Sequence, residues 1–204
     1  MDCAFEQIVK RMIDSLSTKN RQYIDPVEHC VEVSAEAIKA DKYIFVCGNG
    51  GSASTASHIA NDLLCHLKNW NRKNYKVLAL TDNVAAITSL TNDYGFQEVF
   101  SRQLKAFGSR GDVLWAFSTS GNSKNCVKAI ETAKEMGIYT VGITGSKGGC
   151  MKDLADLWMP VASDEVTRVE ELHMIYAHIL AENIEAVVSP VEKKVKRAVA
   201  NSLP

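Results

Sequence analysis

The sequence lacks the features that mark nucleic-acid-binding, membrane and secreted chains. Its formal net charge is −1 at pH 7 over 204 residues. A chain so close to neutrality has no excess of Lys and Arg for a phosphate backbone, which argues against nucleic acid as a partner. No run approaches the roughly 20 apolar residues of a membrane span, and the first residues lack the basic and then apolar segments of a signal peptide. We therefore expect neither nucleic acid nor membrane as a partner.

The six cysteines lack the spacing of a disulfide framework, and none of them forms a CxxC pair. Cys47 falls at the end of a strand-like run, and Cys30 and Cys126 fall in helical stretches. Reduced thiols that pack in the protein interior are the interpretation that fits this pattern. The cysteines therefore predict a cytoplasmic location.

The sequence does contain enough apolar residues for one globular domain, and they form strand-like runs that alternate with helical runs. With 46% hydrophobic and 23% charged residues, the chain can bury one sizeable core. Strand-like runs cover residues 43–47, 77–80, 113–117, 139–144 and 157–161. Helical runs cover residues 52–67, 83–90, 95–106, 123–136, 150–155 and 165–187. Strands that alternate with helices predict an α/β fold with a parallel sheet covered on both faces.

About 40 residues precede this alternation and read as two helices. Phe5, Ile8 and Met12 recur at helical spacing, and Asp25 followed by Pro26 predicts the cap and first residue of the second helix. Their apolar stripes need a partner, which is either the helices of the sheet or another subunit. We predict one domain over residues 1–187, with residues 1–40 as oligomerisation helices. Residues 188–204 form a basic tail that we expect to be solvated rather than functional.

Two turns rich in glycine and hydroxyl groups are the most informative feature of the chain. One covers residues 46–54 and the other residues 118–123, and each links a strand-like run to a helical run. Such turns direct backbone N–H groups and hydroxyls at one point, where the helix dipole favours an anion. One such turn alone could be a capping loop, but two at the carboxyl ends of parallel strands predict one phosphate site. Neither turn has the spacing of a Walker loop or of a dinucleotide-binding fingerprint.

Two pairs of polar residues fall where a core would favour apolar ones. His58 and Asp62 are four residues apart, and Glu170 and His178 are eight apart, so each pair lies on one side of its helix. Such pairs on two helices could hold a divalent metal or divide the roles of acid and base. Taken alone, the spacing favours the simpler alternative of a helical ion pair and a structural histidine.

A short polar segment, residues 92–95, is expected to form a turn between two helical runs. Asn92 and Asp93 can cap the helix that follows. Because the segment follows the helix after the second strand, it can also reach the rim of the phosphate site and bind sugar hydroxyls.

Together these segments resemble the sugar isomerase (SIS) domain family, and within it the phosphoheptose isomerases. The resemblance extends over residues 1–187 and is carried by residues 47–52, 92–96, 100–103, 111–114, 118–123, 144–145 with 148–149, and 168–173. It implies a five-stranded flavodoxin-like sheet and a homotetramer whose active sites combine residues of more than one subunit. It implies a zinc ion in each subunit, held by His58, Asp62, Glu170 and His178, the same quartet that spacing selects.

The resemblance also implies how a phosphorylated sugar is bound. The phosphate would be held by residues of the two turns: Asn49, Gly50, Gly51, Ser52, Ser118, Thr119, Ser120 and Ser123. Asn92 and Asp93 would contact the sugar. The implied reaction interconverts sedoheptulose 7-phosphate and D-glycero-D-manno-heptose 7-phosphate through an enediol. A non-enzymatic tetrameric adaptor like the DnaA initiator-associating protein, and an isomerase of another sugar phosphate, are the alternatives.

Two members of the quartet depart from the family pattern. The family has glutamate, its candidate general base, where this chain has Asp62, and glutamine where it has Glu170. Aspartate is shorter by one methylene, and a loss of about 1 Å of reach can cost on the order of 10²-fold in rate. Glu170 adds a carboxylate that can take over the role of the base. We therefore expect Asp62 or Glu170 as the base and His178 as the acid.

Overall fold

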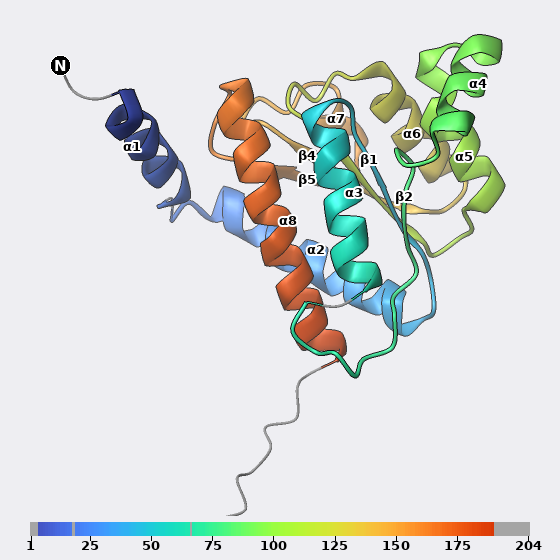
Figure 1. Cartoon of the computed structure of the whole chain (residues 1–204), viewed down its shortest axis with the longest axis horizontal. Helices are drawn as coiled ribbons and strands as arrows, with labels where there is room; N and C mark the ends of the chain where they lie inside the picture. The colour runs from blue at the N-terminus through green and yellow to red at the C-terminus, as the bar shows by residue number, and fades with distance from the viewer. Residues whose placement is uncertain (1–3, 18, 66, 190–204) are drawn as a thin grey trace, which may run out of the picture.

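The computed structural model describes residues 4–17, 19–65 and 67–189 and forms a parallel five-stranded sheet between two layers of helices (Figure 1). The strands are β1 (Ile44–Cys47), β2 (Val77–Ala79), β3 (Val113–Ser118), β4 (Tyr139–Thr144) and β5 (Leu157–Pro160). Their order is β2-β1-β3-β4-β5, and all neighbours are parallel. This is the flavodoxin-like order, whose switch point lies between β1 and β3. The predicted fold class is confirmed.

Helices α2 (Arg21–Lys39), α3 (Gly51–Leu64) and α8 (Val166–Val188) cover one face of the sheet (Figure 1). The other face carries α4 (Val84–Tyr94), the short 3-10 helix η1 (Phe96–Glu98), α5 (Val99–Phe107), α6 (Lys124–Glu135) and α7 (Met151–Leu154). Helix α1 (Ala4–Leu16) extends away from both layers (Figure 1). None of the described helices is long and apolar enough to cross a membrane.

Side chains of the central strands point alternately into two separate cores. In β3, Trp115 and Phe117 enter the core beneath α3 and α8, while Leu114 and Ala116 enter the core beneath α5 and α6. Both faces of β1 and β3 are fully buried. This explains why these strands read as continuous apolar runs rather than as an alternation of apolar and polar residues.

The predicted start of the second helix is wrong. Helix α2 begins at Arg21, and the side chain of Asn20 accepts a hydrogen bond from the backbone N–H of Gln22. Pro26 therefore lies inside the helix rather than at its first residue. Asn20 is as good a cap as Asp25, and its position lets the helix form one turn earlier.

Two other boundaries differ from the prediction. Residues 92–94 form the last turn of α4 instead of a separate turn, and Gly95, with φ of 88°, ends the helix. Helix α3 ends at Leu64, because the backbone N–H groups of Leu67 and Lys68 donate to the carboxylate of Glu185 on α8. The tail prediction falls almost entirely on residues 190–204, which lie outside the described residues.

Candidate active site

The two hydroxyl-rich turns meet at the carboxyl edge of the sheet, as predicted. The first turn follows β1 and the second follows β3, and these strands are neighbours in which Cys47 pairs with Ala116. Gly50, with φ of 53°, precedes α3, and Ser123 precedes α6. The N-termini of two long helices therefore open at the switch point of the sheet, where open α/β sheets bind their ligands.

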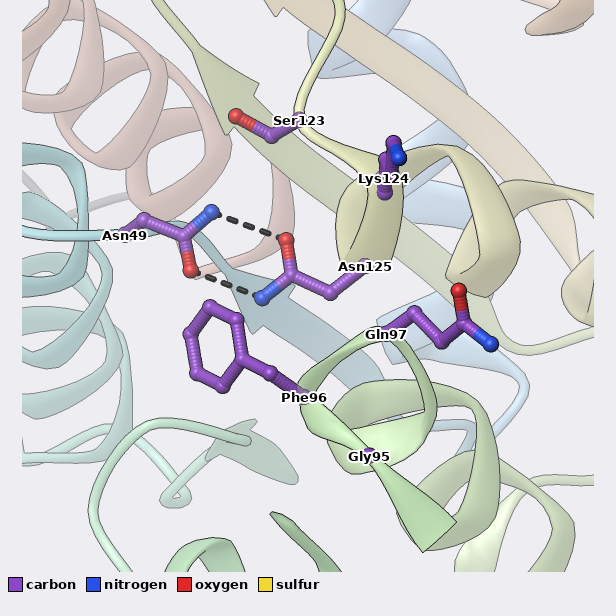
Figure 2. Close-up of a pocket in the computed structure, with 7 residues that line it drawn as sticks. All are labelled: Asn49, Gly95, Phe96, Gln97, Ser123, Lys124 and Asn125. Atoms are coloured by element: carbon purple, nitrogen blue, oxygen red, sulfur yellow. Dashed lines mark hydrogen bonds between the residues drawn. The ribbon is translucent and has the colours of Figure 1, made fainter.

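A reciprocal pair of amide hydrogen bonds joins the first turn to the start of α6, directly after the second turn (Figure 2). Asn49 Nδ2 donates to Asn125 Oδ1, and Asn125 Nδ2 donates to Asn49 Oδ1, both at 2.8 Å. Within the second turn, the hydroxyls of Ser118 and Ser123 lie 3.0 Å apart. These contacts fix the turns relative to each other and prepare a single site rather than two.

A cavity of about 480 Å³ opens beside the amide pair. Its lining comes from both turns, from the start of α6 and from the junction of α4 and η1: Asn49, Gly95, Phe96, Gln97, Ser123, Lys124 and Asn125 (Figure 2). A cavity of this size suits a small ligand. Asn92 and Asp93 lie in the turn of α4 just before it, and the amide of Asn92 donates to the carboxylate of Asp93.

A second hollow, of about 350 Å³, lies between the second turn and the segments that follow β4 and β5. It is lined by Thr119, Ser120, Asn122, Gly145, Lys147, Gly149, Asp164 and Val166. Gly121 has φ of 67°, and a Cβ there would lie 1.9 Å from the carbonyl oxygen of Gly148. This position requires glycine, because the second turn packs directly against the loop after β4.

The predicted phosphate ligands differ in their accessibility. Ser52 and Ser118 are only 4% and 3% exposed, whereas Ser120 and Gly51 are exposed. The buried hydroxyls of Ser52 and Ser118 therefore lie beneath the surface that a ligand would meet. Ser120 and Gly51 lie at that surface.

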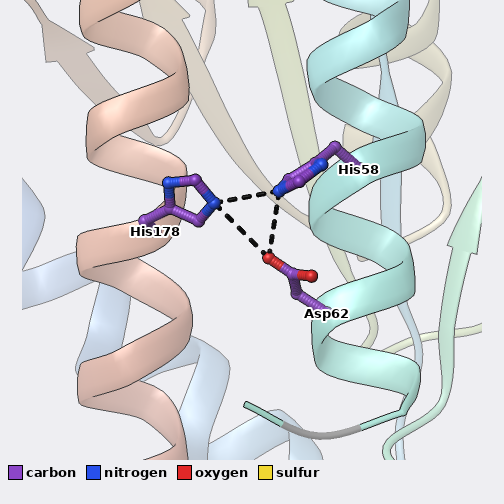
Figure 3. A group of neighbouring side chains, drawn as sticks. All are labelled: His58, Asp62 and His178. Carbon is purple, nitrogen blue, oxygen red and sulfur yellow. Dashed lines mark hydrogen bonds and ion pairs between the residues drawn. The ribbon is translucent and has the colours of Figure 1, made fainter.

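His58, Asp62 and His178 form a compact group between α3 and α8 (Figure 3). The Nε2 atoms of the two histidines lie 2.9 Å apart. Asp62 Oδ2 lies 3.3 Å from His58 Nε2 and 3.6 Å from His178 Nε2. This atom is fully shielded from solvent and accepts no hydrogen bond from the described residues. Burial of a carboxylate oxygen without a hydrogen bond is unfavourable, and a bound cation would compensate its charge.

The spacing of the three atoms suits a zinc ion. A tetrahedral zinc with ligands at about 2.0–2.1 Å separates two of those ligands by about 3.3 Å. The observed separations of 2.9, 3.3 and 3.6 Å bracket that value. Two imidazoles and a carboxylate are also ligands that zinc accepts in proteins. The residues therefore fit the metal that the resemblance implies.

Glu170, the fourth member of the quartet, lies elsewhere. Its carboxylate packs against the first turn, because a Cβ on Gly51 would lie 2.4 Å from Glu170 Oε1. Eight residues separate Glu170 from His178, which corresponds to about 12 Å along α8. The described residues give its carboxylate no hydrogen bond or ion pair. The structure thus brings together three of the four predicted ligands and leaves Glu170 beside the glycine turn.

Sequence reasoning did not select Phe96, Gln97, Lys124 or Asn125 for the site. Lys124 and Asn125 follow Ser123 directly, and Phe96 and Gln97 follow Gly95. Their place one or two residues beyond Ser123 and Gly95 was the available indication. The amide pair joins two asparagines that are 76 positions apart, so the local spacing of residues could not indicate it.

Comparisons with known proteins assign this architecture to a family. The sequence pattern of the SIS domain matches residues 5–145. The chain therefore belongs to the SIS domain family, as the hydroxyl-rich turns at the switch point indicate.

Its relatives within the family are phosphoheptose isomerases. One from Crocosphaera subtropica is 40% identical over 167 residues, which cover 82% of this chain and 85% of that protein. Another, from Helicobacter pylori strain P12, is 40% identical over 182 residues, which cover 89% and 91%. The solved structure of a phosphoheptose isomerase from Neisseria gonorrhoeae matches with a TM-score of 0.79 at 30% identity, over 90% of this chain and 100% of that one. One from Francisella tularensis gives 0.81 at 28% identity, over 88% and 93%.

Proposed function

We propose that the protein is an aldose–ketose isomerase that interconverts sedoheptulose 7-phosphate and D-glycero-D-manno-heptose 7-phosphate. The observation that carries this proposal is the resemblance to phosphoheptose isomerases at 40% identity over most of the chain. The group of His58, Asp62 and His178 supports an enzyme, since a protein that only binds a partner has no need of it. The adaptor alternative is therefore not favoured.

We assign the phosphate of the substrate to the second turn and the sugar to the first. The carboxylate of Glu170 lies against Gly51, and a carboxylate repels a phosphate. The second turn offers the exposed hydroxyl of Ser120, the side chain of Thr119 and the N-terminus of α6. Asn49, Gly50 and Gly51 then border the sugar, with Ser52 buried beneath them and Asn92 and Asp93 nearby. Binding energy at the phosphate positions the reacting carbons.

The isomerisation needs a base, an acid and stabilisation of an enediol. A base removes the proton from the carbon beside the carbonyl, an enediol forms, and the proton returns to the neighbouring carbon while a second group moves a proton between the two oxygens. We assign the base to Glu170, whose carboxylate lies against Gly51 beside the proposed sugar site, and the acid to His178. For both to act on neighbouring carbons of one substrate, the separation of the two groups must close when the substrate binds. Asp62 is the alternative base, but its Oδ2 lies 3.3 Å and 3.6 Å from the Nε2 atoms of the two histidines, where we assign it to the metal.

We propose that His58, Asp62 and His178 hold one zinc ion per subunit. Bound zinc would polarise the carbonyl and enediolate oxygens of the substrate. Glu170 is a further candidate ligand, and the separation between its carboxylate and the other three residues would have to close for it to bind.

We further propose a homotetramer. On α1, Phe5, Ile8, Val9, Ile13 and Leu16 are exposed. A groove of about 620 Å³ runs between α2 and α8, and its lining includes Val27, Ile179 and Val187. Apolar surface of this extent on helices outside the sheet supports subunit assembly. Deletion of residues 1–20 should abolish both the tetramer and turnover, and an active monomer would contradict shared active sites.

We also propose that the protein works in the cytoplasm. Among the described residues, Cys30, Cys47, Cys65, Cys126 and Cys150 are free thiols. Free thiols persist in a reducing compartment.

The function is tested by incubating the purified protein with sedoheptulose 7-phosphate and a panel of shorter ketose phosphates, with and without zinc. We expect conversion of the seven-carbon substrate at the highest kcat/KM. Preference for a shorter sugar phosphate would favour an isomerase of another substrate. No turnover of any member, with or without zinc, would favour the adaptor.

A further inference from the structure

Arg72 is a buried arginine that is not among the four predicted metal ligands. It connects α3 and α8, the two helices that carry those ligands. The side chain of Arg72, in the loop between α3 and β2, is only 1% exposed. Its guanidinium lies 3.8 Å from the centre of the Tyr75 ring. Its Nε donates to Glu185 Oε1 at 2.8 Å, and the side chain of Glu185 is 4% exposed.

The other nitrogens of Arg72 cap the end of α3. Nη2 donates to the carbonyl oxygens of Asp62 at 3.2 Å and Leu63 at 2.8 Å, and Nη1 donates to the carbonyl of Lys73 at 3.0 Å. The last carbonyls of a helix have no partner within that helix. The guanidinium satisfies two of them, and one belongs to Asp62, a member of the proposed zinc site. Arg72 therefore holds the backbone of Asp62 directly.

Glu185 extends the connection to α8. It lies seven residues after His178, about two turns further along the same helix. Its two carboxylate oxygens also accept the backbone N–H groups of Leu67 and Lys68, which lead away from α3. Arg72 thus bonds to the end of α3, which carries His58 and Asp62, and forms an ion pair with Glu185 on α8, which carries His178. Both side chains of this pair are buried.

We propose that Arg72 is a positioning residue for the His58–Asp62–His178 group. It sets the position of Asp62 through the end of α3, and it sets the spacing of α3 and α8 through Glu185. The inference rests on the zinc site proposed above. Partners that orient metal ligands contribute about 10- to 100-fold to metal affinity or activity. A planar guanidinium reaches a carboxylate and three carbonyls at once, which a lysine ammonium does not.

The test measures zinc affinity by competition with a chromophoric chelator, on protein first stripped of metal and shown by urea titration to be folded. We expect Arg72→Met to lower zinc affinity by about 10-fold or more, and to lower kcat with little change in KM. Arg72→Lys keeps the charge and should lie between Arg72→Met and the parent. If Arg72→Met does not fold, the zinc affinity of Arg72→Lys tests the inference instead. We expect that affinity to be at least several-fold lower than in the parent.

Asp112→Asn is the matched control. Asp112 is also a buried carboxylate, 1% exposed, and it accepts hydrogen bonds from the backbone N–H groups of Tyr43 and Ser109. The Asp112→Asn variant should have a lower free energy of unfolding than the parent, and its zinc affinity should stay within about twofold of the parent. Parental zinc affinity and kcat in the folded Arg72 variants, or an equal loss in Asp112→Asn, would overturn the inference alone. A parent that binds no zinc would overturn the zinc site as well.

Discussion

His58 and His178 are 120 positions apart in the chain, and their Nε2 atoms lie 2.9 Å apart (Figure 3). The contact depends on the parallel packing of α3 and α8, which also places Glu170 beside Gly51 about two turns earlier along both helices. The proposed metal site and the proposed sugar site therefore lie on the same pair of helices. A shift of one helix against the other would alter both sites together.

Zinc content is expected near one ion per subunit in the parent and well below that in His178→Ala, because the variant loses one of three ligands. Affinity should also fall as the pH drops, since a protonated imidazole cannot bind a metal. Metal analysis of the dialysed protein measures the stoichiometry. His29→Ala is the control, because His29 bonds to the hydroxyl of Tyr139 and lies outside the group. Equal zinc in the parent and His178→Ala would remove His178 from the site.

Glu170→Gln separates the two candidates for the base. If Glu170 removes the substrate proton, the amide should lower kcat by about 10²-fold or more, since it keeps the shape and loses the basicity. Asp62→Asn should then act mainly through weaker zinc binding, and excess zinc should restore part of its kcat. Steady-state kinetics at several zinc concentrations distinguishes the outcomes. Parental kcat in Glu170→Gln, with no turnover in Asp62→Asn at any zinc concentration, would assign the base to Asp62.

Ser120→Ala should weaken substrate binding more than Ser52→Ala does. Ser120 is exposed on the turn assigned to the phosphate, and a hydrogen bond to a charged group contributes roughly 1.5–3 kcal/mol, or about 10- to 100-fold in KM. Ser52 is 4% exposed, so its loss should act mainly on stability. Calorimetric titration with inorganic phosphate and urea unfolding measure the two effects. The reverse order of phosphate affinities would place the phosphate at the first turn.

His173 should make the protein less stable below neutral pH. Burial lowers the pKa of His173 to about 4, and the backbone of Thr144 offsets only part of that effect. Between the unfolded pKa of about 6.5 and the folded value, the unfolded chain binds a proton that the fold excludes, so stability falls as the pH drops through this window. The loss amounts to about 3 kcal/mol in total. Urea unfolding of His173→Leu from pH 7.5 to 4 should show a flatter profile, and an unchanged profile would assign the pH dependence to other groups.

The parallel sheet and its turns could be predicted because they depend on local pattern. The strand at residues 139–144 has the predicted limits, and both hydroxyl-rich turns lie at the predicted edge. Boundaries set by distant contacts could not be predicted. Glu185, more than 100 positions away, accepts the N–H groups that would otherwise have extended α3.

The candidate site was predictable to the same extent. Spacing selected His58, Asp62 and His178, because each helix presents its own residues at fixed intervals. Spacing also selected Glu170, but the packing of α8 against Gly51 decides where its carboxylate lies, and that packing is a tertiary property. The role of Arg72 could not be predicted from the sequence either, since it depends on a loop that folds back onto the end of α3.

The most direct test of the central claim follows sedoheptulose 7-phosphate with the zinc-loaded protein in deuterated water by proton NMR. An isomerase that works through an enediol should produce the seven-carbon aldose phosphate with deuterium from the solvent at carbon 2, and Glu170→Gln should slow its formation. No aldose phosphate, or an aldose whose carbon 2 carries only the hydrogen that was on carbon 1, would contradict the account.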